Sequence, residues 1–472
     1  MKVNRSLHYI FWRWHFYAGL FITPLLITLS LSGIGYLFRE EVEDFIYKDL
    51  YFGKSAQTES ISMSDSISLT EKKYPHYSVA KISEFNGDYN TRLTIANEYT
   101  GQQKYVYLDS NNQIIGDQNA SETFANIMRE LHSSLLVGGT IVNYTVELAA
   151  CWTIFLIVTG LYMSIRQFKN TPSSNKREKA KRRHSIIGII FTIPLFLLVA
   201  SGLPWSGFMG NQIYKIASSN ESLGYPKLYM APPESKVKEL PWATRKEAPP
   251  ESNSNEPKAI SVDELQKGIE IKKPYVISLP ADPKGVFTVS KSSGSGITGM
   301  HVAPNEEITA YFDQYSGELI SKTDYRDYGL LAQWFTYGIP LHEGHLFGWP
   351  NKILCLLTTL SLLLLIYYGI KMWLARKPKG KLAAPPKQRD KKSIFVFFIM
   401  MVILGAVMPL FGLSVLVIFA IELLIYVFLK NTIIMKKHLY HRVQMLFYLL
   451  FSFFLPLIKK TISTIIINAM II

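Results

Sequence analysis

The chain has 472 residues, of which 48% are hydrophobic and 18% charged, and its formal net charge is +14. A single soluble domain rarely exceeds about 250–300 residues, so the sequence must form more than one structural unit. Apolar runs long enough for a membrane lie at 14–38, 185–214, 353–370 and 394–421. Because a membrane helix needs about 20 such residues, these runs predict a polytopic α-helical protein in a lipid bilayer. They exclude a soluble enzyme and a protein that binds nucleic acid.

Positive charge is concentrated in two short segments. Residues 166–183 and 375–392 each hold eight Lys or Arg residues against one acidic residue. Short basic loops stay on the cytoplasmic side of a membrane. We therefore expect both segments in the cytoplasm, together with the N-terminus, which carries Lys2, Arg5 and Arg13.

Four spans are predicted in chain order, at about 14–38, 137–165, 185–208 and 350–374. The polar segments between them, 39–134 and 209–345, should lie outside. Alternating apolar residues predict strands at 91–95, 104–108, 285–290 and 308–312, with turns at 109–112 and 313–317. Residues 231–258 are rich in Pro, Glu, Ser and Asn and predict a loop. Two small α+β domains outside the membrane are expected.

The chain repeats itself at fixed spacing. The first span contains His15, Gly19, Ser32 and Gly33. The third span contains the same residue types at the same spacing, namely His184, Gly188, Ser201 and Gly202. Segments 131–138 and 341–348 precede the second and fourth spans. Both begin with Leu-His, and in both a Leu lies four residues and a Gly six residues after the His. Such self-similarity predicts a span–outer domain–span unit that occurs twice, as parallel repeats.

The duplication predicts two histidine pairs, because equivalent residues of parallel repeats lie at the same depth. His15 and His184 should lie on the cytoplasmic side, and His132 and His342 on the outer side. Two histidines on facing helices can supply both axial ligands of a b-type haem.

The glycines one turn after the inner histidines, Gly19 and Gly188, would let a porphyrin approach the backbone. The sequence thus predicts two b-type haems, whose iron is ligated by the four paired histidines. For any one of them alone, an interfacial polar residue is the simpler explanation.

Zinc is the rival metal, but it prefers one four-ligand cluster, whereas these histidines divide between two faces. The segment 342–345, His-Glu-Gly-His, could form a small outer site with His132, although its spacing fails the His-Glu-x-x-His pattern. His345 could also pair with a haem propionate or be an ordinary loop residue. Within the second span, Asn143 and Glu147 could relay protons or bind a quinol, or could bond a neighbouring helix.

These residues resemble a known family. The segment His-Phe-Tyr-Ala-Gly-Leu-Phe at 15–21 with its later Ser-Gly, the two Leu-His segments, and the Tyr-x-Asp turns at 107–109 and 311–313 are similar to the PepSY-associated transmembrane-helix proteins. These are described as iron-regulated membrane proteins, and some members are di-haem ferric-siderophore reductases of the bacterial inner membrane. The resemblance covers about 5–430.

The resemblance implies PepSY folds at 60–118 and about 259–322, haem ligation by His15, His132, His184 and His342, and a multi-pass protein of the bacterial cytoplasmic (inner) membrane. It also implies an oxidoreductase that reduces a ferric siderophore or similar ferric chelate. Some members carry a fused flavin-binding domain. No Gly-rich nucleotide-binding unit follows the fourth span here, so the expected donor is a membrane quinol or a cytoplasmic flavoprotein.

The segment 393–429 is too long for one upright crossing and contains Gly405, Pro409 and Gly412, which predicts a helical hairpin with spans 5 and 6. The remaining tail is basic and then apolar, and 443–472 could be a further span.

The expected domains are 1–38 (N-terminus and span 1), 39–130 (outer domain 1), 131–169 (Leu-His segment and span 2), 170–183 (basic loop), 184–208 (span 3), 209–340 (outer domain 2), 341–374 (Leu-His segment and span 4), 375–392 (basic loop), 393–429 (hairpin) and 430–472 (tail).

Transmembrane electron transfer during iron uptake is the leading functional hypothesis. A transporter or permease is the first alternative, because parallel repeats are also a transporter architecture. A non-enzymatic regulator that binds peptides through its PepSY-like domains is the second. A reducible haem spectrum would support only the first.

Overall fold

The computed structural model describes residues 5–167, 175–218, 250–252, 258–377 and 384–431. It divides into two compact units. The helical unit contains Met1–Ile34, Glu130–Asn211 and Leu354–Ile472, and the sheet unit contains Gly35–Arg129 and Gln212–Ile353. Most of the expected loop at 231–258, parts of both basic loops and the tail beyond 431 with its possible seventh span lie outside the described residues.

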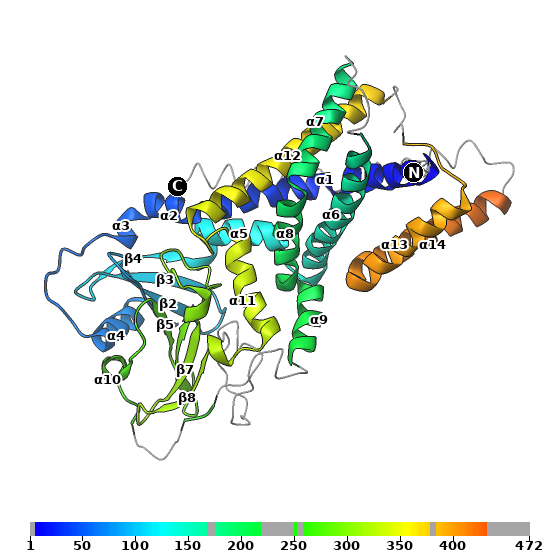
Figure 1. Cartoon of the computed structure of the whole chain (residues 1–472). Helices are drawn as coiled ribbons and strands as arrows, with labels where there is room; N and C mark the ends of the chain where they lie inside the picture. The colour runs from blue at the N-terminus through cyan, green and yellow to red at the C-terminus, as the bar shows by residue number, and fades with distance from the viewer. Residues whose placement is uncertain (1–4, 168–174, 219–249, 253–257, 378–383, 432–472) are drawn as a thin grey trace. The chain divides into compact units, whose positions relative to one another are not determined.

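Three described helices are long and apolar enough to cross a membrane (Figure 1). They are α1 (Arg5–Leu37), α6 (Thr140–Gln167) and α12 (Trp349–Arg376). They coincide with the predicted first, second and fourth spans. The protein is therefore a multi-pass membrane protein, as its composition predicts.

The third span is not the single straight helix that we expected over 185–208. It consists of α7 (Lys176–Ile190) and α8 (Thr192–Gly202), bent by 60° at Phe191 and followed by a 3₁₀ turn, η2 (Leu203–Trp205). Pro194 explains the break, because its ring excludes the carbonyl of Ile190 and it has no N–H to donate. The part that carries His184 and Gly188 is α7.

The predicted C-terminal hairpin is formed by α13 (Lys391–Val407) and α14 (Pro409–Asn431), which are separated at Met408. Gly405 and Gly412 lie against each other, and a Cβ added to either would be 3.0 Å from the Cα of the other. Within the helical unit the hairpin packs against α6 through buried Phe411, which contacts Trp152 and Phe155. Apolar burial and aromatic contact hold it there.

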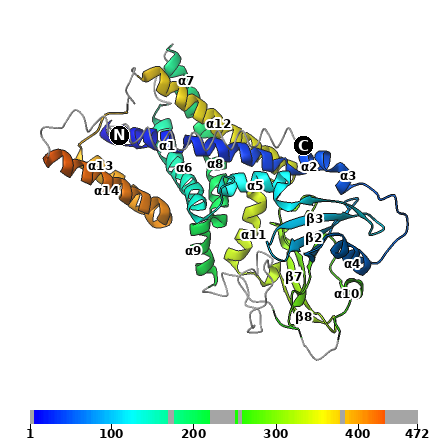
Figure 2. The ribbon, with the colours of Figure 1, turned by 180° about the vertical axis from the view of Figure 1, so that it is seen from behind.

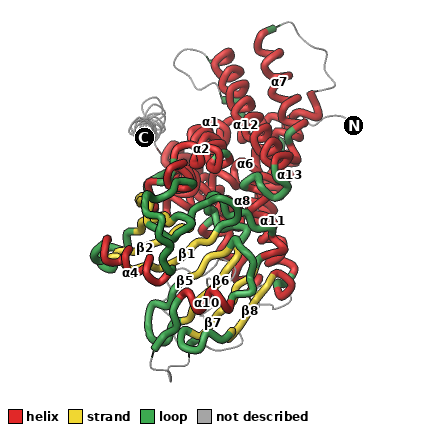
Figure 3. Tube along the Cα trace, turned by 90° about the vertical axis from the view of Figure 1, so that its left-hand side faces the viewer, coloured by secondary structure: helices red, strands yellow, loops and turns green. Residues whose placement is uncertain are grey.

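The sheet unit contains one antiparallel sheet of eight strands in the order β4-β3-β2-β1-β5-β6-β7-β8 (Figure 3). The strands are β1 (Tyr77–Glu84), β2 (Thr91–Asn97), β3 (Gln103–Leu108), β4 (Ile114–Asn119), β5 (Tyr275–Ser278), β6 (Val286–Lys291), β7 (Ile308–Asp313) and β8 (Leu319–Asp324). The four predicted strands correspond to β2, β3, β6 and β7. The two polar segments supply four strands each and meet at the β1–β5 pair, where Ile82 lies opposite Ile277.

Two short helices, α4 (Met63–Lys73) and α10 (Val262–Gly268), cover one face of the sheet (Figure 2). Apolar side chains from both segments form a single core beneath them, including Ile82, Leu93, Ile277 and Val289. The Asp263 carboxylate of α10 accepts the backbone N–H groups of Met63 and Ser64 at 2.9 and 3.0 Å. The carboxylate thereby supplies acceptors for backbone N–H groups in the first turn of α4, which have no partner within the helix.

The remaining described elements link these parts. They are α2 (Arg39–Ile46), α3 (Lys48–Tyr51), η1 (Ala120–Glu122), α5 (Phe124–Ser134), α9 (Gly207–Ser218), η4 (Pro304–Glu306), η5 (Tyr325–Asp327) and α11 (Leu330–His342). In both segments a helix, α5 or α11, follows the last strand and ends at or just after a Leu-His pair. A loop with positive-φ glycines then leads into the next span.

Candidate functional site

The structure brings His15 of α1 and His184 of α7 together inside the helical unit. Their ring centroids are 6.4 Å apart and the ring planes are inclined at 82°. Imidazole nitrogens ligate metals at about 2.0–2.1 Å, so two rings on opposite sides of one iron have centroids about 6 Å apart. The spacing of the two histidines therefore fits a pair of axial ligands.

Hydrogen bonds identify which nitrogen of His15 is available as a ligand. Its Nδ1 lies 2.8 Å from the hydroxyl of Thr159 on α6. That hydroxyl donates its own proton to the carbonyl of Phe155, at 2.8 Å. The hydroxyl oxygen must then accept from His15, so Nδ1 carries the hydrogen and Nε2 carries the lone pair.

His184 has the same arrangement on the other side. Its Nδ1 lies 3.0 Å from the carbonyl oxygen of Leu365 on α12, which can only accept. Nε2 is again the nitrogen with the lone pair. Metal-ligating histidines are commonly oriented by such a bond from their second nitrogen. The donor set at this position is therefore that of an oriented bis-imidazole site.

Glycines lie beside this pair of histidines, so the backbone there carries no side chains. A Cβ added to Gly19 would meet no atom within 4 Å, and one added to Gly188 would meet only Leu365 at 3.8 Å. A Cβ added to Gly160 of α6 would lie 3.2 Å from the His15 ring, so this glycine makes room for the imidazole itself. The space beside Gly19 is open and a Cβ at Gly188 would make only an ordinary van der Waals contact, so neither position would obstruct a flat prosthetic group.

His132 and His342 are placed in equivalent positions of the two segments. His132 lies in the last turn of α5, and its Nδ1 is 2.9 Å from the carbonyl oxygen of Leu29 on α1, so Nε2 is again the acceptor. A Cβ added to Gly33 would lie 3.4 Å from the His132 ring. His342 is the last residue of α11. Because His132 belongs to the helical unit and His342 to the sheet unit, their pairing stays a prediction.

The family model of the PepSY-associated TM region matches residues 12–376. The chain belongs to this family. The matched range includes all four histidines of the sequence prediction and every strand of the sheet. No curated protein matches this PepSY-associated chain.

His345 of this PepSY-associated protein lies within the sheet unit. Its Nε2 is 3.2 Å from the carbonyl oxygen of Ser293, and burial lowers the pKa of its ring. Glu343 beside it forms an ion pair of 3.2 Å with buried Arg39. No group of three or more His, Cys, Asp or Glu side chains in the described part of the chain is arranged to hold a metal ion. The geometry thus gives no support to the small outer zinc site.

Asn143 and Glu147 face the start of α9 inside the helical unit. The Glu147 carboxylate accepts the backbone N–H groups of Phe208 and Met209 at 2.8 and 3.0 Å, and Asn143 Oδ1 accepts that of Gly207 at 2.7 Å. Both side chains therefore cap a helix N-terminus, where a negative charge is favoured. Of the roles left open by the sequence, this geometry matches the bond to a neighbouring helix.

Proposed function

We propose that this PepSY-associated protein transfers electrons across the membrane through two b-type haems. One would be held by His15 and His184 and the other by His132 and His342. When bound, haem supplies reversible one-electron chemistry, whose potential the axial ligands and their hydrogen bonds tune. The observation that carries the proposal is the close approach of His15 and His184, in which both Nδ1 atoms are already hydrogen-bonded.

The surrounding residues keep the inner pair ready for ligation. Thr159 and Leu365 fix the tautomers and ring orientations, so that little reorganisation is needed when the ligands bind iron. The bare backbone at Gly19 and Gly188 leaves room for the ring system, and the apolar spans exclude water from it. None of these residues needs to donate or accept a proton for one-electron transfer.

The duplicated unit is also part of the proposal. Each outer segment supplies four consecutive strands, a covering helix and a helix that ends at Leu-His, and we interpret these as two PepSY-like repeats fused edge to edge. In both, the Asp of the Tyr-x-Asp turn accepts backbone N–H groups: Asp109 from Asn111, and Asp313 from Tyr315. The shared turn explains why both sequences keep this residue at the end of a strand.

The basic loops give the proposal its orientation, with the N-terminus in the cytoplasm of a bacterial inner-membrane protein and the sheet unit outside. A cysteine in place of Lys387 should be protected in intact cells from a membrane-impermeant thiol reagent, whereas one in place of Thr100 should react. The experiment uses a background with Cys151 and Cys355 replaced by alanine. Labelling of Lys387→Cys with protection of Thr100→Cys would reverse the orientation of both histidine pairs.

A ferric siderophore or similar ferric chelate is the proposed electron acceptor, and a membrane quinol or cytoplasmic flavoprotein the donor. One-electron reduction requires proximity and orientation but no acid or base from the protein. It also drives release, because an oxygen-rich chelator holds the hard ferric ion more tightly than the softer ferrous ion. The outer histidines, His132 and His342, lie at the ends of the helices that follow the two halves of the sheet.

The reaction can be tested on purified protein that has been reduced by dithionite under anaerobic conditions. Addition of a ferric siderophore with a ferrous-trapping dye should reoxidise the haem bands and form one dye complex for each electron lost. The His132→Ala variant should slow this step strongly, because it removes a ligand at the proposed exit. Purification without any haem band would contradict the electron-transfer proposal. Reoxidation by quinones but by no ferric chelate would contradict the assigned acceptor.

A further inference from the structure

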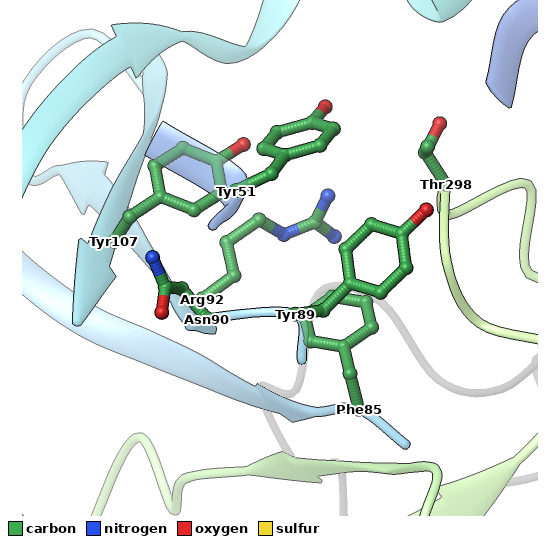
Figure 4. A pocket seen from close by; sticks show the side chains of 7 residues that line it. All are labelled: Tyr51, Phe85, Tyr89, Asn90, Arg92, Tyr107 and Thr298. Atoms are coloured by element: carbon green, nitrogen blue, oxygen red, sulfur yellow. The ribbon is translucent and has the colours of Figure 1, made fainter. Parts of the chain in front are cut away.

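Aromatic side chains fill the inner space on one side of the sheet unit. Tyr51, Tyr89 and Tyr107 pack around Arg92 and leave a hollow with room for about one water molecule (Figure 4). A larger partner would therefore contact the unit at its surface. There α11 (Leu330–His342), which follows the last strand of the sheet, exposes an unusual set of side chains.

The exposed face of α11 is apolar. Leu330, Trp334 and Tyr337 are 73%, 54% and 37% exposed, and their spacing of i, i+4 and i+7 places them on one side of the helix. The other side, with Phe335 and Thr336, is buried within the sheet unit. No charged residue of α11 lies on the exposed face. A helix that faces water normally carries polar residues there, so this face has the character of a contact surface.

The helix before the first Leu-His segment provides an internal comparison. α5 (Phe124–Ser134) also follows the last strand of its segment, but the residues that it exposes are Arg129, Glu130 and Ser133, which are all polar. Of these two helices, only α11 exposes large apolar side chains. An apolar outer face is therefore not a requirement of the arrangement that the two segments share, and it points to a contact that only the second segment makes.

The end of α11 is fixed to the start of a membrane span. Asn351, in the first turn of α12, donates through Nδ2 to the carbonyl of Leu341 at 3.3 Å, and its Oδ1 accepts the backbone N–H of Leu346 at 3.1 Å. Between the two helices, Phe347 is 68% exposed, and Trp349 at the start of α12 is 61% exposed. Because α12 is long and apolar enough to cross the bilayer, the end of α11 lies where the chain enters lipid.

We propose that the exposed face of α11 lies in the membrane–water interface, on the side of the bilayer that carries the sheet unit. Helices with an apolar face that contains Trp or Leu bind at the boundary between lipid headgroups and acyl chains. Trp and Tyr are enriched at this boundary because their rings have an apolar body and a polar tip. The contact would attach the sheet unit to the membrane surface through a helix that does not span it.

Continuity with the span favours lipid over a second protein as the partner of this face. Phe347 and Trp349 are exposed next to the first turn of α12, and Ile353, one turn further along, is 49% exposed. Exposed apolar side chains thus continue from α11 into a helix whose outer surface contacts lipid. The inference goes beyond the proposed electron transfer and does not depend on it, since it rests on residues of the sheet unit alone.

Spin labelling can test the contact on the full-length protein in vesicles of phosphatidylethanolamine and phosphatidylglycerol. A nitroxide is attached to Leu330→Cys, Trp334→Cys or Tyr337→Cys in the cysteine-free background. Oxygen is concentrated in lipid and a nickel chelate stays in water, so we expect oxygen collisions to exceed nickel collisions at all three positions. Leu357→Cys, at a 47% exposed position of α12, is the lipid control and should give the same order. Thr100→Cys, in the exposed turn between β2 and β3, is the water control and should give the reverse.

The two reagents separate the possible surroundings of α11. Nickel collisions above oxygen collisions in the folded variants would place the face in water and overturn the proposal. Low rates for both reagents would show that protein covers the face, as in a dimer, and would overturn it as well. Trp334→Phe provides a conservative second measurement if the cysteine variants do not fold. The fluorescence that this change removes should be quenched by brominated phospholipid, and quenching by aqueous iodide alone would contradict the contact.

Discussion

Replacing His15 or His184 with alanine should each remove the same haem from the purified protein. The centroids of the two rings are 6.4 Å apart, and either variant leaves one imidazole, which cannot supply two axial ligands. The haem-to-protein ratio should fall from about two to about one, because the outer pair is untouched. His132→Ala and His342→Ala should each remove the other haem.

Pyridine haemochrome analysis gives the ratio, and low-temperature absorption spectra distinguish the two haems. Each inner variant should therefore lose the same spectral component, and the double variant His15→Ala/His184→Ala should lose no more than either alone. His301→Ala is the matched control, because this side chain is 66% exposed and belongs to neither predicted pair. If His15→Ala and His132→Ala were to remove the same component, the parallel-repeat assignment of the pairs would be wrong.

The inner pair could be predicted because it depends on spacing within helices. His15 and Gly19, like His184 and Gly188, lie four residues apart in one helix, and helical geometry places residues at that spacing on one face. The predicted parallel repetition would place the two faces at one depth. The contacts that orient the rings could not be predicted in this way. Thr159 and Leu365 act from two other helices, and which side chains meet there depends on tertiary packing.

The sheet was predicted only where its sequence pattern was strong. The alternating residues of β2, β3, β6 and β7 were sufficient, but β1 contains Lys81 and a bulge after Val79, and β5 has four residues. The pairing of β1 with β5 joins residues almost 200 positions apart, for which no local pattern gives a signal. Two separate outer domains were therefore the natural expectation, whereas the strands form one continuous sheet. The capping box of Ser261 and Glu264 could have identified α10 from the sequence.

Glu147 illustrates how a structure can change the reading of a buried carboxylate. From the sequence alone, an acidic residue inside a span is a functional hypothesis. Here the side chain is 2% exposed, and both of its oxygens accept backbone N–H groups from the first turn of α9. Its negative charge faces the positive end of that helix. The same carboxylate holds the segment after the broken third span against α6, so its role is to fix that connection.

Glu147→Ala should therefore destabilise the protein by about 2–5 kcal/mol, because it leaves two backbone donors without partners in a buried position. Glu147→Gln should have a smaller effect, since the amide oxygen can still accept one bond. Thermal unfolding in detergent measures the loss, and faster hydrogen exchange at the amides of Phe208 and Met209 would localise it. Glu422→Ala is the control, because Glu422 is 55% exposed and its 3.9 Å ion pair with Lys387 should contribute about 0–1 kcal/mol. A Glu147→Gln protein of parental stability and exchange that had lost proton-coupled turnover would instead establish a proton relay.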